Sequence, residues 1–142
     1  MESETVKVPN AWLKTSAPSL AEMEAMAEDA YARLPEEFRT LCGNLVIRVE
    51  DFATDEVLKE MEIEDAFELL GLFQGIGLAQ GYEMATGTLP NMIFLYRRPI
   101  LDYWAEHEET LGDVVTHVLV HEIGHHFGLS DDDMERIEEE AG

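Results

Sequence analysis

Apolar residues at helical spacing mark the first ordered element of the chain. The apolar stripe over 20–34 recurs every three or four residues, as one face of a helix does. Ser19 and Glu22 form an S-x-x-E capping box at its start, and Pro35 follows its end. The pattern therefore predicts a helix that begins at Ser19 and stops before Pro35.

Two later segments have the pattern of strands. Residues 44–52, NLVIRVEDF, alternate apolar with polar side chains, which predicts a strand with one solvated face. Residues 91–99, NMIFLYRRP, predict a second strand, ended by Pro99. Between them, residues 67–91 contain five glycines among apolar residues, and the apolar positions follow no stable helical or strand period. We interpret that segment as a long loop with irregular pieces.

The remaining elements are predicted helices. Residues 36–42 predict a short helical turn, 54–62 and 100–108 predict short helices, and a T-x-x-D cap at Thr110 opens a longer helix, 111–127. An acidic last helix follows. Residues 1–17 show no periodicity, so we expect an extended or loosely tethered arm. A chain of 142 residues can bury one hydrophobic core, and we expect a single domain over 1–142.

The net charge of the chain argues against two classes of binding partner. Thirty-one acids against nine bases give a formal charge of −22, which repels phosphate backbones and anionic membrane surfaces. We therefore expect no nucleic-acid partner and no membrane partner. The chain has one cysteine, Cys42, so no internal disulfide can form, and we expect this residue in the core. The opening residues do not have the pattern of an export signal. These features favour a cytoplasmic protein. The oligomeric state is left open.

The predicted helix 111–127 carries a metal-binding pattern. His121 and His125 stand four residues apart, so about one helical turn separates them and both imidazoles project from one face. Glu122 lies about 100° further around the helix, where a carboxylate can take a proton from a water activated by the ion. This HExxH pattern predicts a zinc site with Glu122 as its base.

Two residues after the helix extend the pattern. Gly128 can adopt the left-handed conformation that turns the chain back, and Asp131 follows ten places after His121. Requiring a glycine and then an acid or a histidine at these places lowers the chance expectation of the motif by roughly fifty-fold. Asp131 is therefore the predicted third zinc ligand. The alternative is that Asp131 only favours the start of the acidic last helix, which Ser130 can cap.

The extended motif HExxHxxGxxD resembles that of metzincin-type zinc peptidases, and its aspartate form is similar to snapalysin. The chain is also similar, along most of its length, to small bacterial zincin-like metallopeptidases, through SLAEMEAMAEDAYARLPEEFR, NLVIRVEDF, ELLGLFQG, IFLYRRPIL and HEIGHHFGLSDDDM. The resemblance implies an α+β zincin-like fold, in which a small mixed β-sheet packs against helices. It also implies Zn²⁺ at His121, His125 and Asp131, with Glu122 as the general base.

The expected activity is hydrolysis of peptide bonds in a peptide or protein substrate. By the same resemblance, the strand IFLYRRP pairs with the substrate, although Arg97 and Arg98 equally suit an edge strand that resists aggregation. His117 is expected to line the cleft, to hydrogen-bond to a metal ligand or to be an ordinary histidine, and direct metal binding by His117 is a further alternative. His126 is expected to pack in a buried polar place or to hydrogen-bond to a metal ligand. Two other functions stay open: a zinc-binding module without turnover, and a hydrolase of non-peptide amides.

Overall fold

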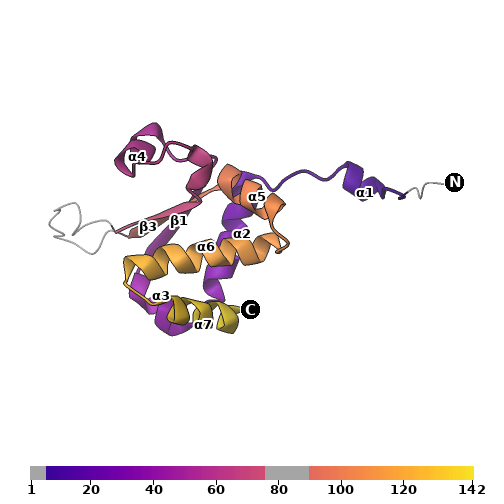
Figure 1. Ribbon diagram of the computed structural model, residues 1–142. Helices are drawn as coiled ribbons and strands as arrows, with labels where there is room; N and C mark the ends of the chain where they lie inside the picture. The colour runs from indigo at the N-terminus through magenta and orange to yellow at the C-terminus, as the bar shows by residue number, and fades with distance from the viewer. Residues whose placement is uncertain (1–5, 76–89) are drawn as a thin grey trace.

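The computed structural model describes residues 6–75 and 90–142, which form an α+β fold. A small mixed sheet has the strand order β1-β3-β2. Helices α2 and α6 pack against each other and against this sheet, and α7 lies beyond α6 (Figure 1). The predicted fold class is thus confirmed. The elements are α1 (Asn10–Leu13), α2 (Leu20–Ala32), α3 (Glu36–Cys42), β1 (Leu45–Glu50), α4 (Asp55–Glu60), the 3-10 helix η1 (Ala66–Glu68), β2 (Gly71–Gln74), β3 (Asn91–Tyr96), α5 (Arg97–Glu106), α6 (Leu111–His126) and α7 (Asp131–Ala141).

Helix α2 begins where the capping box predicts. Ser19 Oγ accepts a hydrogen bond from the Glu22 backbone N–H at 3.1 Å, and Glu22 Oε1 accepts one from the Ser19 N–H at 2.9 Å. These two bonds satisfy donors that a helix start otherwise leaves unpaired. The predicted short helix α3 is also present, and it ends at Gly43 with φ of 58°. Its last residue, Cys42, is buried in the core as predicted.

The sheet contains one strand that its sequence does not predict. β1 pairs with β3 in parallel, and β2 pairs with β3 in antiparallel register, with Phe73 opposite Ile93. The interpretation of residues 67–91 as a loop is therefore wrong for β2, while residues 76–89 lie outside the described part. Glycine and leucine carry little strand preference by themselves. Pairing with β3 and burial of alternate side chains stabilise β2 instead.

Strand β3 ends earlier than expected, at Tyr96, and Arg97 already begins α5. Pro99 lies in the first turn of that helix, where its missing N–H breaks no helical hydrogen bond. β3 is also the central strand, so both of its edges are occupied. The expectation that this segment is an edge strand, open to substrate, is therefore wrong.

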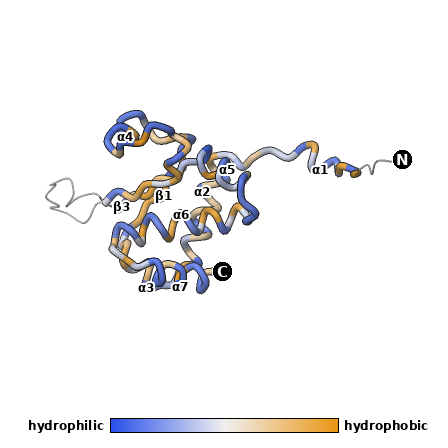
Figure 2. Tube along the Cα trace, in the orientation of Figure 1, coloured by the Kyte–Doolittle hydropathy of each residue, from blue (hydrophilic) through white to orange (hydrophobic). Residues whose placement is uncertain are grey.

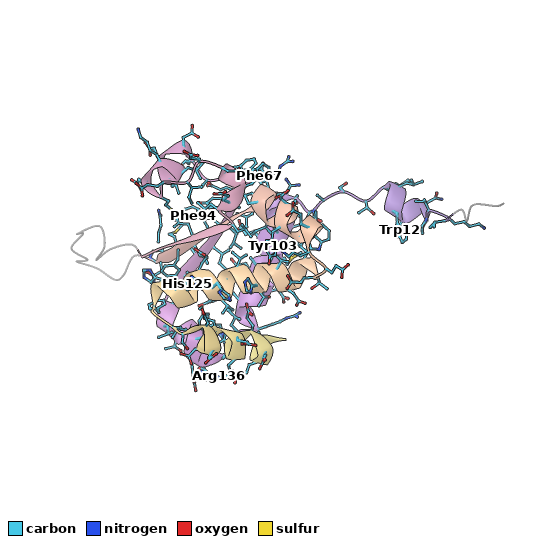
Figure 3. The ribbon with its side chains drawn as sticks, viewed as in Figure 1. Trp12, Phe67, Phe94, Tyr103, His125 and Arg136 are labelled. Carbon is cyan, nitrogen blue, oxygen red and sulfur yellow. The ribbon has the colours of Figure 1, made fainter. Side chains whose placement is uncertain are left out.

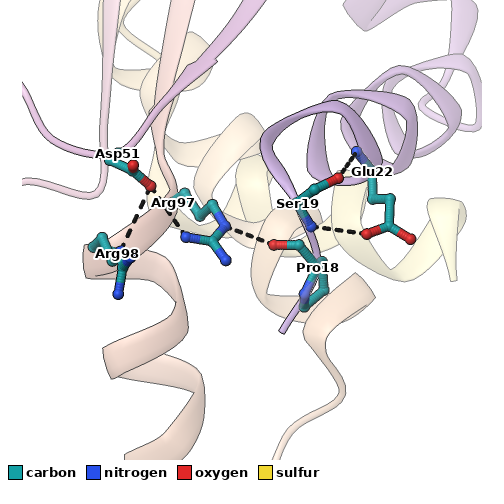
Figure 4. A network of polar contacts seen from close by, with 6 residues as sticks. All are labelled: Pro18, Ser19, Glu22, Asp51, Arg97 and Arg98. Atoms are coloured by element: carbon teal, nitrogen blue, oxygen red, sulfur yellow. Dashed lines mark hydrogen bonds and ion pairs between the residues drawn. The ribbon is translucent and has the colours of Figure 1, made fainter. Parts of the chain in front are cut away.

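Arg97 anchors two distant segments of the chain (Figure 4). Its Nε donates a hydrogen bond to the Pro18 carbonyl at 2.6 Å, and its Nη1 lies 3.1 Å from Asp51 Oδ1. Arg98 adds a longer contact to the same carboxylate, at 3.6 Å. The base of the N-terminal arm is thus tied to the body, whereas α1 and Trp12 extend away from it (Figures 1 and 3).

Both faces of the sheet are covered by apolar side chains. Ile93 and Leu95 of β3 point into the main core between the sheet, α2 and α6. Tyr96 packs on the other face in a smaller cluster that includes Leu69. Apolar and polar residues alternate along α6 and α7, as expected for helices buried on one side (Figure 2). The described residues contain no helix that is long and apolar enough to cross a bilayer.

Candidate metal centre

A row of three histidines runs along α6 on the side away from the sheet core. The helix begins at Thr110, whose Oγ1 accepts a hydrogen bond from the Asp113 N–H at 3.1 Å, as the T-x-x-D cap predicts. His117, His121 and His125 are spaced by four residues, so they share one face. We call them the histidine row. The opposite face is buried and contains Val114, Val115, Val118, Leu119, Val120, Ile123 and Gly124.

Helix α7 brings acidic residues up to the histidine row. Gly128 has a φ of 74°, and the chain there turns back so that α7 runs antiparallel to α6 (Figure 1). A Cβ built on Gly124 would lie 2.8 Å from Cγ of the buried Met134, so this glycine allows a close approach of the two helices. Ser130 caps α7 by accepting a hydrogen bond from the Asp133 N–H.

Three donors from these two helices converge. Glu138 Oε1 lies 2.7 Å from His117 Nδ1 and 3.7 Å from His121 Nε2. The rings of His117 and His121 are tilted against each other with centroids 4.0 Å apart. Within residues 6–75 and 90–142 these three side chains form the one group of three or more donors that lie within 4.8 Å of one another.

The chemistry of this group fits a metal ion. Imidazole nitrogens and a carboxylate oxygen are the donors that zinc prefers together. Glu138 Oε1 is buried and has no hydrogen-bond partner among the described residues, although an imidazole nitrogen lies close to it. A buried carboxylate oxygen without a hydrogen bond is costly unless a cation or another donor compensates it. The group therefore suits an ion such as Zn²⁺.

The surroundings of His121, at the middle of the row, favour its neutral form. Burial lowers the pKa of His121, and the neighbouring His117 lowers it further, while Glu138 acts in the opposite direction. A neutral imidazole offers the lone pair that a metal ion needs. The environment of His121 thus favours the protonation state of a ligand.

Glu122 lies on a different side of α6, against the sheet. A Cβ added to Gly71 in β2 would lie 3.2 Å from Glu122 Cγ and 2.9 Å from Val118 Cγ1. Only a residue without a side chain lets the strand pass this close. Burial raises the pKa of Glu122 to about 7. The pKa of the buried Tyr96 is raised to about 12, mainly by burial. The charges of Glu50 and, to a smaller extent, Glu122 add to this rise.

His125 and Asp131 are nearby but are less enclosed. His125 is exposed towards the C-terminal end of α6 (Figure 3), and its ring centroid lies 5.6 Å from that of His121. Asp131 is exposed in the first turn of α7, and its charge raises the pKa of His121, as the smallest of several influences. His121, His125 and Asp131 are not gathered as tightly as the three donors described above. Their joint ligation of zinc stays a prediction.

His126 lies outside the donor group. Its ring packs against Phe73 of β2 with centroids 4.2 Å apart, and it would contact a Cβ added at Gly75. The residue is exposed, so the expectation of a buried position is wrong. Its contacts with β2 indicate a role in packing the C-terminal end of α6 against the sheet.

Glu138 is the residue that sequence reasoning missed. It stands seven residues after Asp131, which is two helical turns on the same face of α7. His117 likewise stands one turn before the HExxH motif. If the two helices are antiparallel, a carboxylate two turns after Asp131 comes close to a histidine one turn before the motif. These two spacings could have indicated Glu138 and His117.

A cavity of about 610 Å³ opens beside this group, between α2, α6 and α7. His117 and Glu138 line it, and its other charged groups are mostly acids. These acids are Asp29, Glu109, Asp113, Glu135 and Glu139, with Arg33 as the basic residue. The cavity connects the donor group to a negatively charged entrance.

Comparison with protein families finds a match that covers most of the chain. Residues 42–141 match the model of the zincin-like metallopeptidase family, a range that includes the sheet, the HExxH helix and α7. A search of curated proteins finds no significant match. The matched range covers well over half of the 142 residues and contains every donor described above. The chain therefore belongs to the zincin-like metallopeptidase family.

Proposed function

We propose that this protein is a zinc-dependent metallopeptidase that hydrolyses peptide bonds. The observation that carries the proposal is the arrangement of one helix, α6. This helix presents the histidine row on one side and Glu122, half-buried beneath β2, next to it. The family implies a metal, typically zinc, and we assign His121, His125 and Asp131 as its ligands.

Zinc bound there would supply a Lewis acid that polarises the substrate carbonyl and activates a water molecule. Glu122 then serves as the general base. It takes a proton from the attacking water and afterwards delivers that proton to the leaving amine, so the carboxylate is regenerated with each turnover. Its raised pKa, about 7, suits a group that must both accept and release a proton near neutral pH.

The strand next to Glu122 offers a place for an extended peptide. β2 pairs with β3 along one edge, and the described residues place no strand on its other edge. An extended peptide can add to a free strand edge through backbone hydrogen bonds. We therefore assign substrate pairing to β2 in place of the strand IFLYRRP. Cys42, buried and single, agrees with the cytoplasm as the compartment that we propose.

A peptide-library cleavage assay tests the function. The zinc-loaded wild-type protein is expected to cleave a subset of peptides, and the same protein treated with a chelator is expected to cleave none. Readdition of zinc should restore cleavage. Zinc binding without cleavage of any peptide would contradict the proposal and favour a zinc-binding module. Cleavage confined to non-peptide amides would assign the site to a different hydrolase.

A further inference from the structure

The histidine row is long enough to serve two different ligand sets. His117 and His125 are eight residues apart, which is about 12 Å along the helix axis at 1.5 Å per residue. Asp131 and Glu138 are seven residues apart on the antiparallel α7, a comparable distance of about 10 Å. The two carboxylates therefore face opposite ends of the row, and His121 lies between them.

We propose that His117, His121 and Glu138 form a second site for a divalent cation of the zinc class, which shares His121 with the assigned zinc ligands His125 and Asp131. The shared nitrogen is Nε2 of His121. Because one nitrogen lone pair binds one ion, the two sites exclude each other. The description of the first site rests on the proposed function, whereas the second rests on the converged donors alone.

The distances suit an ion of this size. Zinc binds nitrogen and oxygen donors at about 2.0–2.2 Å, so two donors on a tetrahedral ion stand about 3.3–3.6 Å apart. Glu138 Oε1 is 2.7 Å from His117 Nδ1 and 3.7 Å from His121 Nε2, which brackets this spacing. For these two pairs of donors the distance has to change by less than an ångström. An ion would also compensate the buried oxygen of Glu138, which has no hydrogen bond.

The second site has its own access from solvent. His117 and Glu138 line the cavity of about 610 Å³, together with Glu135 and Glu139. An acidic entrance raises the local concentration of cations. Glu122 lies against β2 instead, on another side of α6. An ion in the second site occupies the His121 nitrogen that the first ligand set needs, so we expect it to hold the enzyme in an inactive form.

Zinc binding by a set of variants tests this inference, measured by competition with a chromophoric chelator. His125→Ala removes a ligand of the first site alone, and we expect this variant to retain one zinc per chain, bound at the second site. Adding Glu138→Gln to it should abolish binding. Adding Glu139→Gln is the matched control, because it removes one acid from the same cavity and should leave binding unchanged.

The outcomes separate the two proposals. If His125→Ala binds no zinc, or binds it equally with and without Glu138→Gln, the second site is overturned. If Glu138→Gln alone abolishes binding while His125→Ala does not, the second site stands and the assignment of the first ligand set fails. His117→Gln in the His125→Ala background repeats the test should the Glu138 variant fail to fold, and it is likewise expected to abolish binding.

Discussion

The half-buried carboxylate of Glu122 should destabilise the metal-free protein at neutral pH. Its pKa is raised from 4.5 to about 7 by burial against β2. When folding raises the pKa of an acid, the protein has its full stability at pH values below the pKa of the unfolded state. It loses stability as the pH rises towards the pKa of the folded state, because the folded protein resists ionisation. The cost therefore develops between about pH 4.5 and pH 7. Replacing the carboxylate with a neutral amide of similar shape, in Glu122→Gln, should remove it.

The magnitude follows from the two pKa values. At 1.36 kcal/mol per pKa unit, the difference between 4.5 and about 7 corresponds to about 3 kcal/mol at its limit. Glu122 is only half-buried, and solvent screening reduces this figure, so we expect about 1–2 kcal/mol. In metal-free protein at pH 8, Glu122→Gln should be more stable than wild type by this amount.

Urea denaturation at several pH values measures the effect. The stability advantage of Glu122→Gln should be small at or below about pH 4.5 and should grow until the pH exceeds about 7. Glu28→Gln, at an exposed position in the middle of α2, is the matched control and should show no such trend. An advantage that stays constant with pH, or a variant less stable than wild type at pH 8, would refute the reasoning about burial.

Three further substitutions test contacts that position the site. Gly71→Ala places a methyl group 2.9 Å from Val118 Cγ1, and should lower the free energy of unfolding by about 1–3 kcal/mol in thermal or urea denaturation. Gly112→Ala, in the first turn of α6 where an added Cβ would meet nothing within 4 Å, is its control and should be neutral or stabilising. Arg97→Ala removes the bonds to Pro18 and Asp51, so limited proteolysis should cut the arm faster than in Arg98→Ala, which loses only an exposed contact. Gly128→Ala forces alanine to a φ of 74°, which costs about 1–2 kcal/mol and should weaken zinc binding in a chelator competition by disturbing the turn into α7.

Local signals were sufficient where the chain satisfies its own backbone groups. The capping residues Ser19 and Thr110 begin α2 and α6 as the sequence predicts, because each accepts a hydrogen bond from an N–H three residues later. The HExxH motif was equally local, since its spacing lies within one helical turn. The positions of His121 and Glu122 on α6 therefore followed from the sequence.

The misses concern contacts between elements. Strand β2 exists because β3 pairs with it, and its glycine at position 71 reflects the closeness of α6 rather than a loop. Similarly, Glu138 reaches His117 only because Met134 packs against Gly124 and fixes α7 on α6. A local sequence pattern predicts neither the partner of a short strand nor the way two helices pack. Arg97 was misassigned for the same reason, since its partners lie in distant segments.

Glu122 is the residue that we propose as the base of a peptide-cleaving zinc site. The most direct measurement is the cleavage rate of wild type and Glu122→Gln on the best library peptide, at equal and verified zinc occupancy. We expect the variant to retain zinc but to cleave at least about 100-fold more slowly, since a general base contributes about this much to the rate. Equal rates at equal zinc occupancy would contradict this role of Glu122.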